Sequence, residues 1–497
     1  MSTRAAGTAM VAAPAAGVAT GPGTPPRWRR YSGLAVLAGC VGVATASLPL
    51  PVLLGFDPWV WLIWGREALR GGIANDGSVA WKPLPVLVTA PAAVFGDAAP
   101  ALWTVAARAG GLFGLVLVAR LAVRIARQVR GGATAGTVAA TVAVATFLLS
   151  PDAESRWLRH LLQANIEPVT VMACLWAAER HLDGRRWHAL LLLCAAALTR
   201  PEAWPFLGLY GMWLLWSTRR RWWWAAPAVL AVLATVPVLW FVGDRVVSGD
   251  PLSGAVVAQV LTGSPTQRWI LALDNLAASV IAPVWVGAAV CVVWAAHLRR
   301  GLPAALAACA LVWAAEVVVM AGVFGYAALG RFYAPVSAVL CVLAGAAAGW
   351  AVTAPRPVLL RGAVAVALVA ACVPLAAPRV AWLPLQLEHA AERSAYEHDL
   401  YAVAAAVGGR EGLLACGNLA IDTVRPAVEV RPALAYRLDL PLGGVRHILE
   451  TRSGTTIAQV GSPLHAALQQ RPSGEVVLVG QSARFAVYTE FCWRSPR

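Results

Sequence analysis

Two charged residues in the first long polar segment have the types that a group-transfer reaction needs. Asp57 lies in the motif Gly-Phe-Asp-Pro-Trp (55–59), directly after an apolar run of about 20 residues. Lys82, the only lysine in the chain, lies in the motif Trp-Lys-Pro-Leu-Pro (81–85). A positioned carboxylate can take a proton from an attacking hydroxyl group, and an ammonium group can bind a phosphate. The types of these two residues therefore permit proton transfer and anion binding, and the rest of the chain has to support or exclude that chemistry.

The chain that must position these residues is too apolar to be one soluble domain. It has 497 residues, of which 59% are hydrophobic and 13% are charged. Apolar runs of about 20 residues recur along it, and each is long enough to cross a bilayer. The sequence therefore predicts a polytopic α-helical membrane protein with about eleven transmembrane helices. The predicted spans are 33–54, 98–119, 133–150, 166–180, 187–199, 203–217, 222–242, 276–297, 302–322, 332–352 and 358–377.

The arginines indicate how the spans are oriented. A formal net charge of +15 could suggest a nucleic-acid partner, but the arginines cluster in short loops between apolar runs. This is the positive-inside pattern of membrane proteins, so we expect membrane lipids and no nucleic acid as partners. An odd number of spans places the N-terminus inside and the C-terminus outside the cytoplasmic (inner) membrane. The arginines assigned to the inner side include Arg120, Arg124, Arg127, Arg130, Arg185, Arg186, Arg219, Arg220, Arg221, Arg299, Arg300, Arg356 and Arg361.

Composition divides the chain into three parts. Residues 1–32 are a cytoplasmic tail that we expect to be disordered, because it offers little bulky apolar surface. Residues 33–377 form the transmembrane domain, with a first outer loop at 55–97, and residues 378–497 form a small extracytoplasmic α/β or α+β domain. Cys416 and Cys492 of that domain could form a disulfide in an oxidising compartment. The elements expected in it are a helix at 388–393 and strands at 412–416, 475–479 and 485–488.

The outer loops carry further residues that could bind or support a substrate. The tryptophan-rich stretch 58–69 of the first loop suits a helix lying in the membrane interface. Polar residues then recur in the later outer loops and at the outer ends of the predicted spans. The candidates among them are Asp152, Glu154, Arg159, His160, Glu167, Arg200, Glu202, Arg331 and Tyr333.

In their order along the chain, these motifs resemble the integral-membrane glycosyltransferases of the GT-C class, notably the bacterial branch related to protein mannosyltransferases and lipid A aminoarabinose transferases. The resemblance covers roughly residues 33–350. Many relatives carry a second acidic residue beside the key aspartate, whereas Pro58 follows Asp57 here. The matching segments are Asp57 with the stretch to Leu69, Lys-Pro-Leu-Pro (82–85), Val-Phe-Gly (94–96) with Ala-Ala-Arg (106–108), Leu-Thr-Arg-Pro-Glu (198–202) and Gly-Arg-Phe-Tyr-Ala-Pro (330–335).

The resemblance implies transfer of a sugar from a polyprenyl-phosphate carrier to a cell-envelope acceptor on the outer side of the membrane. The acceptor would be a polysaccharide, a glycolipid or a glycoprotein. Asp57 would be the base, alone or with Asp152 or Glu154. No cofactor is required by the motifs; a divalent cation could accompany the lipid phosphate, although no ligand cluster points to one. Donor binding is assigned to Lys82, Arg331, Arg200, Arg159, His160 and Tyr333, and acceptor binding or support to Glu202, Asp152, Glu154 and Glu167.

Each of these residues also has a simpler interpretation. Asp57 could cap the helix that begins at Pro58, since aspartate before proline suits a helix start. Lys82 could extend toward lipid headgroups as an interfacial anchor. Arg200 and Arg331 could contact headgroups in the same way. The charged residues around His160 could belong to a solvated loop, and no second histidine lies at metal-ligand spacing from it.

Two other functions remain open at the level of the sequence. A transporter or flippase of lipid-linked envelope precursors would need ionisable groups near the bilayer midplane. The predicted spans carry few of these, chiefly Arg108 and Glu316. An inactive scaffold subunit with the same fold is the other alternative, since Asp57 has no acidic neighbour. The gathering of polar residues at the outer face favours an enzyme with a one-sided site.

Overall fold

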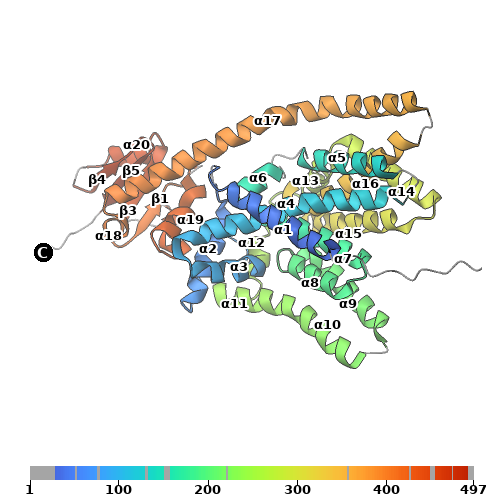
Figure 1. Cartoon of the computed structure of the whole chain (residues 1–497). Coiled ribbons are helices and arrows are strands. Elements are labelled where there is room, and N and C mark those ends of the chain that lie inside the picture. The colour runs from blue at the N-terminus through green and yellow to red at the C-terminus, as the bar shows by residue number, and fades with distance from the viewer. Residues whose placement is uncertain are drawn as a thin grey trace, which may run out of the picture.

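The computed structural model is mainly helical, with a small sheet at one end of the molecule (Figure 1). A bundle of helices fills the rest, and one long helix runs along its side toward the sheet. The described residues are 28–50, 53–74, 79–128, 132–149, 157–219, 222–354, 357–424, 427–447, 454–472 and 474–490.

Each of the eleven predicted spans overlaps a helix of the structure. Among the described residues, four helical segments are long and apolar enough to cross a membrane, or up to six if each of two bent pairs counts as one span. These apolar helices indicate an integral membrane protein, and the full count of eleven spans stays a prediction. The helices are α1 (Trp28–Ala46), α4 (Ala99–Ala126), α5 (Gly132–Leu148), α7 (Glu167–Leu182), α8 (Arg186–Ala197), α9 (Trp204–Ser217), α10 (Trp222–Pro237), α14 (Ala282–His297), α15 (Gly301–Phe324), α16 (Ala334–Thr353) and α17 (Val358–Ala406).

Helix α16 lies at the centre of the bundle because small residues let its neighbours approach closely. A Cβ atom at Gly345 would lie 2.4 Å from the carbonyl oxygen of Ala139 in α5, and one at Gly349 would lie 2.4 Å from that of Ala135. Close backbone approach at small residues is a common way for helices to associate in membranes. At the far end of α16, Trp350 donates a 2.8 Å hydrogen bond to the carbonyl of Ala126 in α4.

Shorter elements connect the long helices, and several of them contribute to the candidate site. Helix α2 comes from the first predicted outer loop, and η4 is a π-helical turn that continues α10. The short elements are α2 (Phe56–Leu69), α3 (Pro83–Ala93), η1 (Gly96–Ala98), α6 (Trp157–Leu162), η2 (Pro201–Ala203), η4 (Val238–Val242), α11 (Gly243–Ser248), α12 (Ser253–Val257), α13 (Pro265–Ala278) and η5 (Gly330–Tyr333).

The tryptophan-rich stretch forms the expected helix, α2, but it does not present its tryptophans to a membrane surface. Trp59, Trp61 and Trp64 are all buried in the protein. The ring of Trp61 packs edge-on against Trp103 of α4, with 5.5 Å between ring centroids. On the opposite side, the C-terminal part of the chain covers α2, and its Tyr436 lies 5.3 Å from Trp59. The tryptophans of α2 therefore contact other parts of the protein, and the expected position of the helix at the membrane interface stays a prediction.

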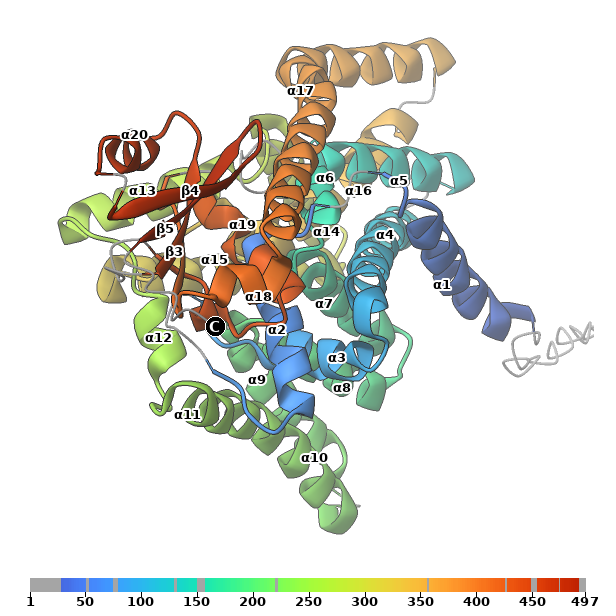
Figure 2. The ribbon, with the colours of Figure 1, turned by 90° about the vertical axis from the view of Figure 1, so that its left-hand side faces the viewer.

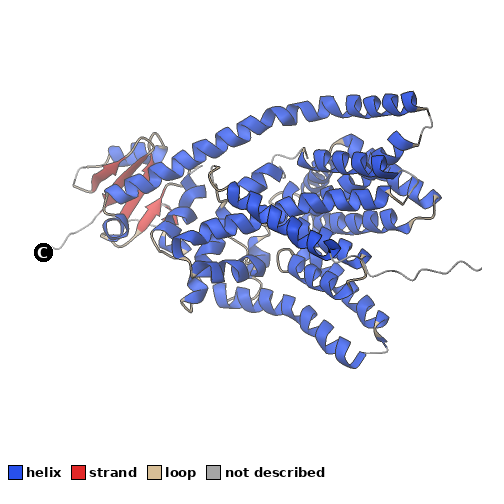
Figure 3. Ribbon diagram, in the orientation of Figure 1, coloured by secondary structure: helices blue, strands red, loops and turns tan. Residues whose placement is uncertain are grey.

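The C-terminal part contains a five-stranded mixed sheet in the order β2-β1-β3-β5-β4. Strand β1 is parallel to both β2 and β3, whereas β5 is antiparallel to β3 and β4. All strands lie at one end of the molecule (Figure 3). The elements are α18 (Gly409–Leu414), β1 (Leu419–Ile421), α19 (Ala427–Arg437), η6 (Leu442–Gly444), β2 (Arg446–His447), β3 (Gly454–Gln459), α20 (Pro463–Gln469), β4 (Val476–Gln481) and β5 (Phe485–Glu490).

Two of the three strands expected in this region are confirmed, as β4 and β5. The third, at 412–416, is wrong, because helix α18 (Gly409–Leu414) occupies most of it. The positive φ angles of Gly408 and Gly409 let the chain begin a new helix directly after α17. A short apolar run of this kind does not distinguish a helix from a strand by its periodicity. Cys416 takes part in a disulfide, whereas Cys492 lies outside the described residues.

Helix α17 joins the bundle to the sheet. It runs from Val358 to Ala406, and at 1.5 Å per residue its path is roughly 70 Å long. The helix expected at 388–393 is part of it, and the boundary expected at 378 falls inside it, shortly after a 55° bend between Pro374 and Ala376. Seen from the sheet end, its last turns stand beside α18 and the strands (Figure 2).

Arg66 of α2 fastens the C-terminal part to the helix that carries Asp57. Its guanidinium group donates to the carbonyl oxygens of Tyr436 at 2.9 Å and Leu440 at 2.8 Å. The same group lies 3.0 Å from the carboxylate of Asp439, which also pairs with Arg70 at 2.8 Å. Main-chain carbonyls and a carboxylate thus surround a guanidinium group that is largely buried.

Replacing Asp439 with asparagine tests the ionic part of this attachment. Asp439 has a φ angle of 55°, which asparagine also tolerates, so Asp439→Asn removes the charge and keeps the backbone. Because Asp439 is 42% exposed, we expect a loss of only about 1 kcal/mol in the free energy of unfolding. Chemical denaturation of the full chain in detergent measures it. The exposed Glu475, changed to glutamine, is the control, and an Asp439→Asn protein as stable as the wild type would contradict this role.

Candidate active site

Asp57 and Lys82 form an ion pair at the start of α2. The Nζ atom of Lys82 lies 3.3 Å from Oδ2 of Asp57, and the two side chains are 14% and 22% exposed. Gly55 is the N-cap of α2, no side chain caps the helix, and Asp57 stands inside its first turn. The capping interpretation of Asp57 is therefore wrong. Its carboxylate is turned toward Lys82 and stays partly accessible.

Lys82 is held in place by the chain on both sides of it. It is extended and precedes α3, and the N–H of Leu84 donates 3.1 Å to the carbonyl oxygen of Leu198. Its ammonium group also lies 5.2 Å from the ring centroid of Trp61, a distance typical of a cation–π contact. Burial lowers the pKa of Lys82, and the Asp57 carboxylate opposes that shift. The side chain thus points into the protein, contrary to the interpretation of Lys82 as a lipid anchor.

The π-helical turn η4 fixes Trp81, the neighbour of Lys82. The indole N–H of Trp81 donates a 3.0 Å hydrogen bond to the carbonyl oxygen of Leu239 within η4. Gly243 leaves room for the ring, because a Cβ atom there would lie 2.1 Å from Nε1 of Trp81. A π-helical turn leaves carbonyl groups with irregular partners and often marks a functional site. Neither Trp81 nor Gly243 was predicted from the sequence.

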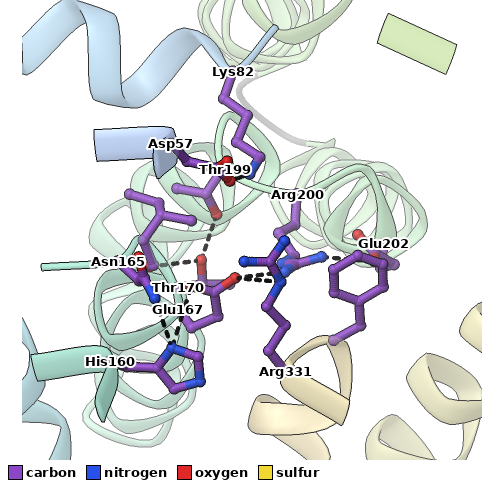
Figure 4. A network of polar contacts seen from close by, with 12 residues as sticks. Asp57, Lys82, His160, Asn165, Glu167, Thr170, Thr199, Arg200, Glu202 and Arg331 are labelled. Carbon is purple, nitrogen blue, oxygen red and sulfur yellow. Dashed lines mark hydrogen bonds and ion pairs between the residues drawn. The ribbon is translucent and has the colours of Figure 1, made fainter. Parts of the chain in front are cut away.

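A second group of charges is centred on Glu167, at the first turn of α7 (Figure 4). Its carboxylate is buried and accepts a 2.8 Å hydrogen bond from Arg200. Arg331 of η5 lies 3.8 Å from the same oxygen, and Nδ1 of His160 lies 3.8 Å from the other one. One carboxylate therefore contacts residues from α6, from the N-cap of η2 and from η5.

The two groups adjoin each other. The carbonyl of Leu198, which holds the Lys82 segment, lies two residues before Arg200. Arg200 also pairs with Glu202 at 3.4 Å, and its guanidinium group lies 3.9 Å from the ring centroid of Phe332. Between the groups, the hydroxyls of Thr170 and Thr199 share a hydrogen bond of 2.8 Å (Figure 4). Three cations thus face three carboxylates in one site.

His160 belongs to this site as a neutral ring. Burial lowers its pKa to about 4, although the Glu167 carboxylate acts in the opposite direction. Its Nδ1 atom lies 3.1 Å from the side-chain nitrogen of Asn165, which can donate to it. Asn165 was not predicted from the sequence. His160 therefore accepts a hydrogen bond and does not act as a cation at neutral pH.

Other predicted residues lie elsewhere. Tyr333 is fully buried, and its hydroxyl donates 3.0 Å to the carbonyl of Ala272, a contact that packs η5 against α13. Arg159 lines a separate pocket beside α17. Asp152 and Glu154 lie outside the described residues. Within the part of the chain that the structure describes, no group of three or more His, Cys, Asp and Glu side chains could hold a metal ion.

This arrangement suits the transfer of a group from an anionic carrier. Asp57 is a partly accessible carboxylate that can accept a proton. Lys82, Arg200 and Arg331 are cations at the same end of the bundle, and preorganised cations stabilise charge that develops on a leaving phosphate. Each cation already has a carboxylate partner, so an incoming phosphate has to compete with Asp57 and Glu167.

Comparisons with known proteins show the fold. No protein-family model matches the sequence, and neither does any curated protein sequence. The structure is similar to the crystal structure of ArnT from Cupriavidus metallidurans bound to undecaprenyl phosphate, with a TM-score of 0.57 and 16% sequence identity. It is also similar to ArnT from the same organism in the apo state, with a TM-score of 0.53 and 16% identity.

These likenesses extend over almost the whole molecule. They cover 94% and 95% of this chain and 100% of each ArnT chain. The expected GT-C architecture is thereby confirmed at the level of the fold.

Gly243→Ala tests whether the space beside Trp81 matters. The added Cβ would clash with the indole, so we expect a loss of about 1–3 kcal/mol in the free energy of unfolding. Thermal unfolding of the purified protein measures it. Gly208→Ala is the matched control, because a Cβ atom there meets nothing within 4 Å. Equal stability of the two variants would show that Trp81 is free to move.

The depressed pKa of His160 predicts a pH-dependent stability. Its ordinary pKa is 6.5 and its folded value is about 4, so between these values the unfolded chain binds the proton and the folded chain does not. Stability is therefore lost as the pH falls from about 6.5 to about 4. This contribution should be absent from His160→Gln, a difference on the order of 2 kcal/mol at the acidic end. Parallel losses of unfolding free energy in both proteins from pH 7.5 to 4.5 would contradict it.

Proposed function

We propose that this chain is a glycosyltransferase that takes a sugar from a polyprenyl-phosphate carrier and transfers it to a cell-envelope acceptor on the outer side of the cytoplasmic membrane. The observation that carries the proposal is the Asp57–Lys82 ion pair beside Arg200 and Arg331. It lies on a fold shared with ArnT, whose crystal structure holds undecaprenyl phosphate. The acceptor would be a polysaccharide, a glycolipid or a glycoprotein.

In the proposed reaction, Asp57 is the base. The acceptor hydroxyl oxygen bonds to the anomeric carbon of the sugar and gives its proton to the Asp57 carboxylate. The bond between that carbon and the phosphate oxygen breaks, and the polyprenyl phosphate leaves with the bonding electrons. A phosphate is a good leaving group, so it needs cations more than a general acid.

Lys82 would couple donor binding to activation of the base. In the structure its ammonium group lies against the Asp57 carboxylate, 3.3 Å away. The ammonium group donates a hydrogen bond to Oδ2 of Asp57, an oxygen that could otherwise take the proton. If the donor phosphate draws Lys82 to itself, Asp57 becomes free to accept a proton. Arg200 and Arg331 would share the phosphate charge while Glu167 keeps them oriented.

The transporter alternative gains no support from Arg108, a basic residue within the second predicted span. Its guanidinium group donates to the carbonyl oxygen of Ser47 at 2.8 Å and to that of Leu161 at 3.1 Å. These contacts fasten α4 to the end of α1 and to α6, which accounts for a buried arginine without a transport pathway. The scaffold alternative is separated from the enzyme by the experiment below.

Asp57→Asn should abolish transfer and leave the fold intact. The amide keeps the shape of the side chain but cannot act as the base, so we expect a fall of at least about 100-fold in turnover. The assay is complementation of a deletion strain, followed by mass measurement of its envelope glycans. The wild-type gene should restore a missing sugar, whose mass identifies the donor and acceptor class.

The control for this experiment is Asp274→Asn, which changes an exposed aspartate of α13. It should complement fully at the same level of membrane insertion. Full complementation by Asp57→Asn would show that Asp57 is not the base. Unchanged glycans in the deletion strain itself would favour the scaffold alternative.

A further inference from the structure

Glu316 is an acidic side chain within the predicted span 302–322, and the reaction proposed above does not use it. It lies in α15, about 12 Å before the end of that helix at Phe324. The side chain is half-buried, and its Oε2 atom is buried without a hydrogen-bond partner among the described residues. An ionisable group within a membrane span is costly and usually has a function. The groups around Glu316 therefore indicate what it does.

The preceding turn of α15 shows which way Glu316 faces. Trp313 stands three positions before Glu316, and residues at this spacing lie on the same side of a helix. The indole N–H of Trp313 donates a 2.9 Å hydrogen bond to the carbonyl oxygen of Phe332 in η5. The ring centroid of Phe332 in turn lies 3.9 Å from Cζ of Arg200. This side of α15 is therefore turned toward the candidate active site.

The charged neighbour of Glu316 is Glu202 of η2. Of the charged groups among the described residues, only this carboxylate acts on Glu316, although α13, α14, α16 and η5 also pack against α15. Glu202 is 8% exposed, and one of its oxygens pairs with Arg200 at 3.4 Å. Its other oxygen is buried and has no partner among the described residues. Tyr333 of η5 and Cys174 of α7 also lie near Glu202.

These surroundings decide where a proton is held. Two neighbouring carboxyl groups do not both stay ionised when no cation lies between them, and a carboxyl group without a cationic partner in apolar surroundings takes up a proton. Glu202 has Arg200 as its partner, whereas no cation among the described residues acts on Glu316. A protonated carboxyl group is a hydrogen-bond donor. Glu316 is therefore the member of the pair that can donate to the unpartnered oxygen of Glu202.

We propose that Glu316 holds a proton at neutral pH, donates it in a hydrogen bond to Glu202, and so sets the charge of the site that receives the carrier phosphate. It would be a positioning residue, because it acts on the phosphate through Glu202 and Arg200. With Glu316 neutral, three cations face three carboxylates in the site. Loss of its proton adds a fourth carboxylate, which repels an anionic carrier. Binding of the carrier should therefore weaken as the pH rises.

The role in carrier binding rests on the proposed function, and it is tested with undecaprenyl phosphate as the probe. Its dissociation constant is measured for the full chain in nanodiscs, over a pH series from neutral to alkaline. Glu316→Gln has the shape of the protonated side chain and cannot gain a charge. It should bind like the wild type at neutral pH. At alkaline pH the wild type should lose on the order of 10-fold more affinity than Glu316→Gln.

The comparison of these two proteins isolates Glu316, because Lys82 and the phosphate of the probe titrate in both. Glu475→Gln, at an exposed position, is the matched control and should follow the wild type at every pH. An equal loss of affinity in the wild type and in Glu316→Gln would overturn the role in carrier binding.

Infrared spectroscopy tests the proton itself, without any carrier. The spectrum of Glu316→Gln is subtracted from that of the wild type at each pH. The difference should contain the carbonyl band of one protonated carboxyl group at neutral pH, and a carboxylate band in its place at alkaline pH. A carboxylate band already at neutral pH would overturn the proposal. If no protein binds undecaprenyl phosphate, the proposed function fails, and the infrared result still decides whether Glu316 holds a proton.

Discussion

A single buried carboxylate organises the polar end of the helical bundle. Glu167 stands at the first turn of α7, and Arg200, Arg331 and His160 converge on it from three other elements. A buried charge is tolerated only when it is paired and hydrogen-bonded. The buried charge of Glu167 therefore has to be paired with Arg200 and Arg331. These pairs hold the segments that contain the two arginines close to the start of α7. The Lys82 segment reaches the same place through the Leu84–Leu198 hydrogen bond.

Helix α2 is the second structural requirement, and it is supported from two sides. On one side, Trp61 of α2 packs against Trp103 of α4. On another side, Trp59 of α2 packs against Tyr436 of the C-terminal part. Arg66 adds hydrogen bonds to the carbonyls of Tyr436 and Leu440. The C-terminal part is therefore more than an appended domain. It covers the helix that carries Asp57, so its attachment bears directly on the position of Asp57.

The charges of the site are balanced before any substrate arrives. Lys82 faces Asp57, and Arg200 faces Glu167 and Glu202. Such pairing avoids the cost of isolated charges in a partly buried place. An anionic ligand at this place would therefore have to exchange partners with these carboxylates.

The sequence alone was enough to predict the helical membrane architecture and to select Asp57, Lys82, Arg200 and Arg331 as candidates. Hydrophobic runs and the charged residues between them indicate which segments lie in a bilayer, and each run can be recognised without knowledge of the rest of the chain.

The tertiary structure determined the contacts between segments that are distant in the sequence. It paired Asp57 with Lys82, 25 positions apart in the chain, and made Glu167 the centre of the arginines. It also buried the tryptophans of α2 under a segment more than 350 residues later. It placed most of 412–416 in helix α18, Tyr333 in the core and Arg159 in a separate pocket. These outcomes depend on which distant segments meet, and that is set by the packing of the whole chain.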